Sequence, residues 1–450
     1  MSKRDKLFIV ILMITTSIVF SGCSNAENAQ SESETQGAPE VESVVGEDDA
    51  KGSEATDGSE KKDEQSAEKS AEKIDEQPAA EQPVMTAWER KAEEAMEILK
   101  EHKKKNLTYA PLNDPKDEYS LNIVKNIHMV AIETGEYSIN QTKTNYGIGG
   151  TDLGISFNFE DKTFIAFGDT FLNEGMQGGW RSNVLAVTTD RDYTDGILFD
   201  YMVAVPGSKN AKELIRSRKM DNVEMTTIPT GGIAIGDTLY LSYMSVRHWG
   251  DPGEWECNYG SIAKSVDGGD NWEPLETLRW PGDSCFCQMV PVITDDYVYV
   301  IGITGGRRGP AKMMRVPVDD YEDFNAYEYL MGYDEQGNPL YETGEEAMYT
   351  AYNVLPKAVG EMSVMYSDYL EEWLVTYMDG KADMVMRSAK NIYGPFSNPV
   401  IIAAQKDFPS LYGAFMNPKW VSEDGTKLAF MMSLFDPVYN VILMELELER

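Results

Sequence analysis

The chain has 450 residues, with 40 basic and 75 acidic side chains and a formal net charge of −35 at pH 7. This balance argues against nucleic acid as a partner, because phosphate binding needs a basic face, and it equally argues against docking on anionic lipid. The 8 Trp, 24 Tyr and 15 Phe nearly all lie after residue 87, so the chain beyond that point can bury a large core.

Residues 1–22 predict a lipoprotein signal peptide. Basic side chains at positions 3, 4 and 6 precede an apolar run over residues 7–20. Its 14 residues are too few for a membrane span of about 20 but suit a signal-peptide core. The run ends at Ser21-Gly22-Cys23, and small residues directly before a cysteine resemble a bacterial lipobox. We expect cleavage before Cys23 and lipidation of its thiol; the alternative is an ordinary signal peptide with an incidental cysteine.

Residues 23–84 predict a disordered acidic tether. From residue 24 to residue 84 the chain has 18 acidic and 5 basic side chains and no aromatic ring. Such a segment buries too little apolar area to offset the entropy lost on ordering. We therefore expect a protein that is lipid-anchored to the bacterial cell membrane with its folded part facing outward, and whose only membrane contact is the anchor.

Residues 85–136 are expected to form a helix and a lead-in segment. The helix is predicted from Thr86 to about Lys104, and residues 86–89 fit a capping box. A single apolar stripe runs along it, formed by Trp88, Ala92, Ala95, Met96 and Leu99. An amphipathic pattern of this kind favours a brace packed on the main domain over a helix that binds a partner.

Residues 137–450 contain one β unit repeated five times. Each unit has an apolar strand, a tight turn, a very apolar second strand and a third strand. The turns are Glu160-Asp161, Gly236-Asp237, Asp295-Asp296, Leu370-Glu371 and Asp424-Gly425. Radial repetition of such units leaves only short, protected sheet edges. The sequence therefore predicts an all-β, five-bladed β-propeller, with residues 128–133 supplying an outer strand that closes the ring.

The segment Ser265-Val-Asp-Gly-Gly-Asp-Asn-Trp272 resembles the Asp-box, a hairpin turn of sialidase-like propellers. Asp267 is expected to hydrogen-bond turn amides while Trp272 packs beneath, which is a structural role. Three other cysteines follow Cys23, namely Cys257, Cys285 and Cys287. Two close thiols without a nearby His make a poor zinc set, so no metal site is predicted. Two alternatives stay open for these cysteines: a disulfide between Cys257 and one of the other two, or free buried thiols.

Two aspartates flank the first predicted hairpin symmetrically. Asp152 lies eight residues before Glu160, and Asp169 lies eight residues after Asp161. In an uninterrupted hairpin they are directly opposite, with Cβ atoms about 5 Å apart, where like charges destabilise a sheet. We interpret the pair as catalytic, because neighbouring carboxylates push their pKa values apart and give one acid and one base or nucleophile. The alternatives are a bulge that shifts the register or neutralisation by Arg181.

Glu361 begins the first strand of the fourth unit, the position that Asp152 holds in the first, and is the third catalytic candidate. Its alternative role is a structural carboxylate that holds channel water or an arginine. Aromatic, amide and cationic side chains at the same rim offer the stacking and hydrogen-bonding surface that sugars need. The substrate-binding candidates are Trp180, Arg181, Asn183, Arg247, His248, Trp249, Gln288, Arg307, Tyr412 and Asn417.

Eight motifs in order carry a resemblance to a known family. They are GGTDLG (149–154), AFGDTF (166–171), WRSN (180–183), IPTGGIAIG (228–236), MSVRHWG (244–250), the Asp-box, GEMSVMY (360–366) and LYGAFMNP (411–418). The chain resembles the bacterial domain of unknown function 4185 family, which includes endo-D-arabinanases. The resemblance implies a five-bladed propeller that acts on furanoside polysaccharides such as D-arabinan, with the family's paired acids at Asp152 and Asp169.

These features together predict a cell-surface glycoside hydrolase of endo-D-arabinanase type, monomeric and acting on a polysaccharide. This interpretation requires no cofactor. Whether the acidic channel holds a calcium ion stays an open question at this point. The alternative functions are a non-catalytic glycan-binding surface lipoprotein and a surface scaffold with no glycan role.

Overall fold

The computed structural model describes residues 87–104, 106–110, 123–294, 296–436 and 438–449. The predicted signal peptide, Cys23 and the acidic tether lie outside these residues. Helix α2 (Ala87–His102) occurs where the sequence predicts a helix, and its Met96 and Leu99 belong to the same buried core as Val124. None of the helices in the described ranges is both long and apolar enough to cross a membrane.

Four-stranded antiparallel sheets form four of the five blades, and the strands of blades 1, 2 and 4 are numbered in chain order from the innermost strand outward. Blade 1 consists of β2 (Leu153–Phe159), β3 (Lys162–Phe167), β4 (Val184–Thr188) and β5 (Tyr201–Met202). Blade 2 consists of β6 (Thr226–Ile235), β7 (Thr238–Trp249), β8 (Trp255–Ser265) and β9 (Glu273–Pro281). Blade 4 consists of β16 (Met362–Ser367), β17 (Glu372–Met378), β18 (Met384–Ala389) and β19 (Val400–Ala403).

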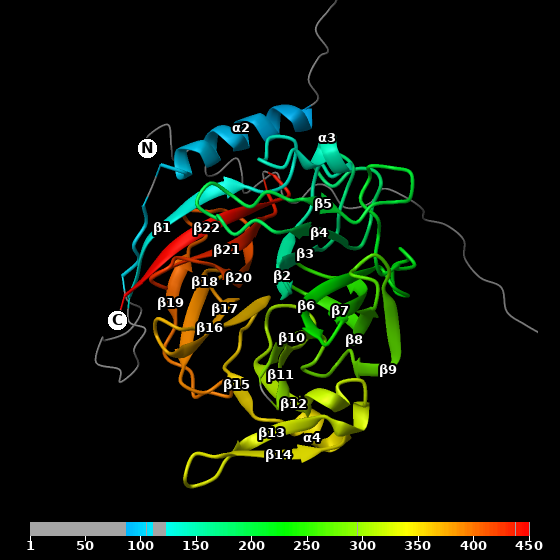
Figure 1. Ribbon diagram of the computed structural model, residues 1–450, viewed down its shortest axis with the longest axis vertical. Helices are drawn as coiled ribbons and strands as arrows, with labels where there is room; N and C mark the ends of the chain where they lie inside the picture. The colour runs from blue at the N-terminus through cyan, green and yellow to red at the C-terminus, as the bar shows by residue number, and fades with distance from the viewer. Residues whose placement is uncertain (1–86, 105, 111–122, 295, 437, 450) are drawn as a thin grey trace, which may run out of the picture. The chain divides into compact units, whose positions relative to one another are not determined.

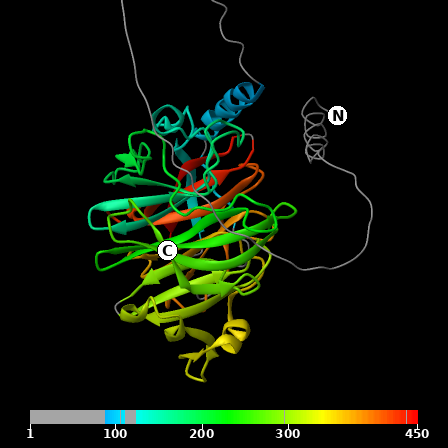
Figure 2. The ribbon, with the colours of Figure 1, turned by 90° about the vertical axis from the view of Figure 1, so that its right-hand side faces the viewer.

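Blade 3 is larger than the repeat predicts. Its inner strands are β10 (Gln288–Ile293), β11 (Tyr297–Ile303) and β12 (Ala311–Pro317). Beyond them lie η1 (Val318–Asp320), η2 (Phe324–Ala326), β13 (Glu328–Tyr333), β14 (Pro339–Thr343), α4 (Glu345–Thr350) and β15 (Asn353–Leu355), which pairs with β12. Figure 2 shows this extension in yellow at the outer end of the blade.

Blade 5 closes the ring with strands from both ends of the folded part. Its order is β20 (Leu411–Val421), β21 (Lys427–Leu434), β22 (Asn440–Glu449) and then β1 (Ile123–Ile132), which pairs antiparallel with β22. The innermost strands contact one another in the cycle β2, β6, β10, β16, β20 and back to β2 (Figure 1). The molecule is therefore a five-bladed β-propeller, and the predicted closing strand is confirmed; helix α3 (Thr142–Tyr146) precedes blade 1.

Strand β3 shows why the second strands are so apolar. Phe164 shares a buried cluster with Leu239 of blade 2, whereas Ile165 shares another with Val441 of blade 5. Successive side chains point to opposite faces of a strand, so both faces of β3 are covered by protein. Burial of one such large apolar side chain stabilises the fold by about 1.5–3 kcal/mol. A continuous apolar run in this protein is thus the pattern of a strand between two blades.

The Asp-box joins β8 to β9 as a structural turn. Asp267 Oδ1 accepts hydrogen bonds from the Asn271 amide at 2.9 Å and from the Ser265 hydroxyl at 2.8 Å. The buried Trp272 ring donates to the Gly269 carbonyl at 2.9 Å. These bonds to the ionised carboxylate hold the pKa of Asp267 below its usual range. The expected structural role of the motif is confirmed.

The cysteines Cys257, Cys285 and Cys287 are free thiols, so the disulfide alternative does not occur in this structure. Cys287 is fully buried and its Sγ lies 3.1 Å from the Gly282 carbonyl oxygen. Within the described part of the chain, no group of three or more His, Cys, Asp or Glu side chains is arranged to hold a metal ion.

Candidate active site

A cavity of about 1250 Å³ lies where the five innermost strands begin. Every blade contributes to its wall, with Asp152, Thr230, Gln288, Glu361 and Tyr412 as the representatives of blades 1 to 5. All inner strands of a propeller run in the same direction, so their first residues meet at one rim. The sequence prediction that strand starts converge on a common site therefore agrees with the cavity lining.

The hairpin of blade 1 contains a bulge that corrects the predicted register. From Ile155↔Ala166 to Phe159↔Lys162 the pairing is as predicted, but Leu153 pairs with Phe167. Gly154 is the residue left over, with φ +93°, and a Cβ there would lie 2.7 Å from a sulfur atom of blade 5. The Gly168 amide consequently donates to the Asp152 carbonyl at 3.2 Å. Asp152 is therefore not directly opposite Asp169, although both line the cavity.

The two carboxyl oxygens of Asp152 differ, because one accepts a hydrogen bond and the other has no partner among the described residues. Its Oδ2 accepts a hydrogen bond from the Tyr412 hydroxyl at 2.8 Å. Its Oδ1 is inaccessible to solvent and has no partner among the described residues. Burial raises the pKa of Asp152 to about 7, the charge of Asp169 adds to the rise, and the hydroxyls of Tyr412 and Tyr439 oppose it. Asp152 is thus suited to carry a proton near neutral pH.

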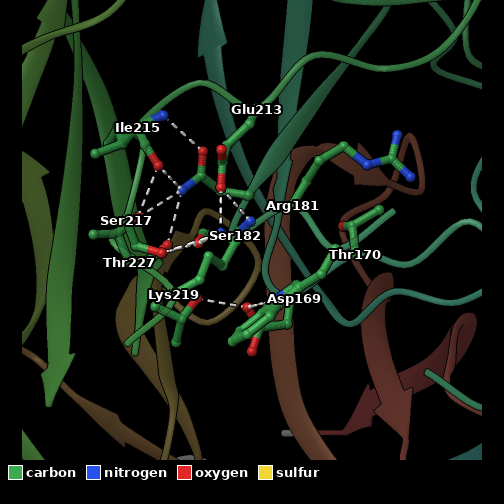
Figure 3. A network of polar contacts seen from close by, with 12 residues as sticks. Asp169, Thr170, Arg181, Ser182, Glu213, Ile215, Ser217, Lys219 and Thr227 are labelled. Carbon is green, nitrogen blue, oxygen red and sulfur yellow. Dashed lines mark hydrogen bonds and ion pairs between the residues drawn. The ribbon is translucent and has the colours of Figure 1, made fainter. Parts of the chain in front are cut away.

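Asp169 is held more firmly in its ionised form. Its Oδ1 accepts hydrogen bonds from the Thr226 hydroxyl at 2.5 Å and from the Trp180 indole at 2.7 Å. Burial raises the pKa of Asp169 to about 6, while these two bonds and the charge of Lys219 limit the rise. Both bonds go to Oδ1, so Oδ2 has no donor among the described residues. Figure 3 shows this carboxylate beside the network around Lys219.

Glu361 lies on the cavity wall but is paired with an arginine. Its Oε1 is 2.7 Å from Arg307 Nη2, and its Oε2 is 2.9 Å from Arg307 Nε. The Arg307 guanidinium also lies over the rings of Tyr412 at 4.9 Å and Trp255 at 5.5 Å. The alternative role of Glu361, a carboxylate that holds an arginine, is the arrangement observed.

A protein-family model described as "Domain of unknown function (DUF4185)" matches residues 137–445. The chain belongs to this family. The match begins just before the first blade and ends within β22, so it covers all residues of the cavity lining and the propeller apart from β1 and the end of β22. The resemblance that the eight sequence motifs predict is confirmed.

Relatives of this DUF4185 protein differ widely in source. The fungal Notoamide biosynthesis cluster protein J of Aspergillus sp. is 28% identical over 316 residues, which cover 66% of this chain and 82% of that protein. A crystal structure from Bacteroides ovatus, of a protein named provisionally as a hydrolase, has 14% identity and a TM-score of 0.51 and covers 74% of this chain and 93% of that one. It shows that the fold is shared.

An exo-β-1,3-galactanase from Phanerochaete chrysosporium, solved with β-1,3-galactotriose, has 10% identity and a TM-score of 0.40. The alignment covers 71% of the DUF4185 chain and 63% of the galactanase, which is less than two thirds of the latter. A similarity of this extent is too remote to transfer a substrate or a residue role.

Five of the ten substrate-binding candidates line the cavity of the DUF4185 domain. The Gln288 amide donates to the Thr304 and Gly306 carbonyls, and Arg307 binds Glu361, whereas the polar groups of Trp180 and Tyr412 donate to the two aspartates. The cavity-lining candidates are Trp180, Trp249, Gln288, Arg307 and Tyr412.

The other five candidates are not part of the cavity wall, which corrects the expectation that they contact substrate there. Arg181 donates to the Gly147 and Ala211 carbonyls at 2.6 and 3.0 Å and so ties loops together. It makes no hydrogen bond or ion pair with either aspartate in the described structure, so the proposed neutralisation by Arg181 is wrong. Asn183 is fully buried, and its amide donates to the Ile215 carbonyl at 2.9 Å.

The remaining three serve contacts elsewhere. Arg247 lies 3.5 Å from Glu256, and His248 Nδ1 lies 2.6 Å from an Asp221 carboxylate oxygen, and neither residue belongs to the cavity lining. Asn417 is fully buried and accepts a hydrogen bond from Asn158 at 3.0 Å. The position of an amide or histidine residue near a strand end is therefore not enough to predict that its side chain faces the channel.

Sequence analysis missed an aromatic wall next to the two aspartates. Tyr439 lines the cavity, and its ring contacts Phe171 and Phe435 at centroid distances of 6.1 and 5.9 Å. Phe171 also stacks on Trp180 at 6.1 Å. A signal was available, because Phe435 and Tyr439 follow the second strand of blade 5 and therefore return to the same rim as Asp169 does in blade 1.

Proposed function

We propose that this protein is a cell-surface glycoside hydrolase that cleaves a furanoside-containing polysaccharide of D-arabinan type. The observation that carries the proposal is the pair Asp152 and Asp169, two carboxyl groups with raised pKa values on the wall of one cavity. Glycoside hydrolysis uses two carboxyl groups in this way, one as an acid and one as a base or nucleophile. Asp152 and Asp169 supply both roles within the described cavity.

The acid is Asp152. Its pKa of about 7 lies above the value of about 6 for Asp169, so a proton shared by the two resides mainly on Asp152. The proton passes from Asp152 to the glycosidic oxygen as the bond to the anomeric carbon breaks. Asp169 either takes a proton from an attacking water or attacks the anomeric carbon itself. Its Oδ2 is the oxygen available for this step, because Oδ1 already accepts two hydrogen bonds.

The rest of the wall supplies flat apolar faces for the C–H surfaces of sugar rings. Trp180 and Tyr439 lie next to the aspartates, and Trp249 and Phe435 lie on the same cavity wall. The D-arabinan specificity rests on the sequence motifs of the family resemblance. The outward-facing, lipid-anchored location rests on residues 1–84, and we propose it as the setting in which an extended polysaccharide reaches the cavity.

The test is to incubate the purified protein with D-arabinan, L-arabinan, arabinogalactan and other wall glycans, and to identify released oligosaccharides by mass. Asp152→Asn and Asp169→Asn are compared with Asp251→Asn, a matched control because Asp251 is an exposed carboxylate on the same cavity wall. We expect release by the wild type and the control and none by the two active-site variants. Binding without release by the wild type would instead establish a glycan-binding lipoprotein, and product sizes would separate endo from exo action.

A further inference from the structure

Lys219 is a lysine with an unusual set of partners. It lies between β5 and β6 with φ +54°, a left-handed conformation that non-glycine residues rarely adopt. Its ammonium group lies 2.5 Å from a Glu213 carboxylate oxygen, 3.0 Å from the Ser217 hydroxyl and in hydrogen-bond contact with the Ser182 hydroxyl (Figure 3). The side chain is 25% exposed, so these contacts are only partly screened by solvent. The chain thus holds this charge in one place.

The position of the Lys219 ammonium group connects it to the active site. Lys219 Nζ lies over the Trp180 ring, 4.8 Å from its centroid. The indole N–H of the same ring donates to Asp169 Oδ1 at 2.7 Å. A cation over one face of the ring and a carboxylate at its N–H make a compact array from three segments of the chain. Lys219 touches neither the cavity nor Asp169 directly in the described contacts, so it acts through its neighbours and its field.

We propose that Lys219 is a positioning residue that keeps Asp169 ionised while Asp152 holds the proton. This role rests on the proposed function, because it decides which of two neighbouring aspartates is the acid. Without a nearby cation, two adjacent buried carboxyl groups compete for one proton on nearly equal terms. Lys219 breaks that symmetry, since it lies beside Asp169, whereas among the described residues the cation near Asp152 is Arg307, whose guanidinium is already bound to Glu361.

The charged and titratable groups around the two carboxylates support this asymmetry. Asp169 faces Lys219, whose charge lowers its pKa, and Glu213, whose smaller effect raises it. Asp152 faces Asp169 and Glu361, and both carboxylates raise its pKa. The hydroxyls of Tyr412 and Tyr439 lie beside Asp152, but their own pKa values are raised well above the usual range, so they stay neutral. Lys219 is therefore the cation that lowers the pKa of Asp169, and its effect adds to the larger ones of the hydrogen bonds from Thr226 and Trp180.

Glu213 allows a test based on the direction in which the titration midpoint of Asp169 moves. It accepts hydrogen bonds from the Ser182 amide at 2.8 Å and from Lys219, so it fixes the loop and the lysine together. If Lys219 acts only as a structural tie, Lys219→Met and Glu213→Gln break the same contact and have the same effect. If Lys219 acts through its charge, the two substitutions move the titration of Asp169 in opposite directions. Removing the cation favours the neutral acid, and removing Glu213 leaves the cation unopposed.

The experiment is a ¹³C NMR titration of the Asp169 carboxyl carbon in the full-length protein, assigned by loss of the signal in Asp169→Asn. We expect Lys219→Met to move the titration midpoint by about 1 pH unit toward higher pH, and Glu213→Gln to move it toward lower pH. Lys219→Arg, which keeps the charge, is expected to restore most of the wild-type midpoint. Lys212→Met is the matched control, because Lys212 is on the same segment but binds Asp270 and Asn271.

The acidic limb of kcat/KM against pH is expected to follow the NMR midpoint in each variant, while KM at high pH stays within about twofold. An unchanged midpoint in Lys219→Met, or shifts of the same sign in Lys219→Met and Glu213→Gln, would overturn the proposal. If Lys219→Met does not fold, Lys219→Arg and Glu213→Gln still give the sign of the effect. Opposite midpoint shifts in a protein that cleaves no glycan would support the electrostatic role of Lys219 and refute the hydrolase function separately.

Discussion

Gly168→Ala is predicted to disable Asp152 without unfolding the propeller. A Cβ at position 168 would lie 2.4 Å from Asp152 Oδ1 and 3.1 Å from Leu153 Cδ1. Gly168 is not among the glycines with positive φ, so alanine brings little backbone strain of its own. The clash is therefore with the functional carboxyl group, which has to move.

The size of the movement follows from the contact. Oδ1 has to retreat by about 0.6 Å to reach the 3.0 Å below which real Cβ contacts are essentially never seen, and by about 1.0 Å to reach 3.4 Å, an ordinary contact. The same rotation lengthens the 2.8 Å hydrogen bond from Tyr412. Misplacing a catalytic group by about 1 Å costs about 100-fold in rate. We expect a loss of kcat/KM of that size, equivalent to about 2.7 kcal/mol in the barrier.

The assay is hydrolysis of D-arabinan, with the melting temperature as the check on folding. Gly380→Ala is the matched control, because Gly380 also lines the cavity and its added Cβ would make only one ordinary contact, at 3.6 Å. The reasoning fails if Gly168→Ala keeps wild-type kcat/KM, or if Gly380→Ala loses as much activity as Gly168→Ala.

The remaining predictions concern charge. The pKa values of about 6 for Asp169 and about 7 for Asp152 predict a bell-shaped pH profile of kcat/KM with its maximum near pH ~6.5, and a plateau through pH 8 would contradict the assignment. Arg307→Met leaves Glu361, whose side chain is 10% exposed, without its cation and is expected to lower the free energy of unfolding by about 3 kcal/mol in urea titrations; a change under about 1 kcal/mol would show that the pair is solvated. Burial raises the pKa of Glu133 from 4.5 to about 8, so the folded protein holds a proton that the unfolded chain releases. Stability should therefore fall as pH rises from 4.5 towards 8, with about 3 kcal/mol at stake by pH 7, and Glu133→Gln should flatten that slope in the pH dependence of urea unfolding.

The blade architecture was predictable because strand, turn and strand have local signals. Asp and Gly at a tight turn favour left-handed conformations, and Gly236 and Gly425 indeed have φ of +55° and +74° between their strands. Apolar runs such as that of β3 require burial on both faces, which radial packing of blades provides. The extension of blade 3 was missed because β13 and β14 interrupt the repeat with strands that pair only with that blade.

The two aspartates were predictable, but their geometry was not. The carboxylates stand out because Asp152 and Asp169 precede and follow a symmetric hairpin. At Gly154, the residue of the bulge, a Cβ would lie 2.7 Å from the sulfur of Met431 in blade 5, and no local sequence pattern predicts a contact across 277 positions. Lys219 was overlooked for a similar reason, since its partner Trp180 comes from another loop, although Glu213 lies on the same segment between β5 and β6.

Polar side chains near strand ends were the least predictable. Asn183 is of a residue type that often binds ligands. Its side-chain carbonyl oxygen instead accepts hydrogen bonds from the Leu214 and Ile215 backbone amides at 3.0 and 2.8 Å. A buried amide that satisfies backbone groups and one that faces a ligand have the same local sequence pattern. Only the path of the chain between β5 and β6, which the repeat does not specify, separates the two roles.

The central claim is that Asp152 is the acid and Asp169 the base or nucleophile, and leaving-group dependence tests it most directly. The measurement is kcat/KM of Asp152→Asn and Asp169→Asn on D-arabinan and on a 4-nitrophenyl arabinofuranoside, whose leaving group departs without protonation. The assignment predicts that Asp152→Asn loses the polysaccharide reaction but keeps most of the aryl reaction, whereas Asp169→Asn loses both. Equal losses on the two substrates in Asp152→Asn, or retention of the aryl reaction in Asp169→Asn, would contradict it.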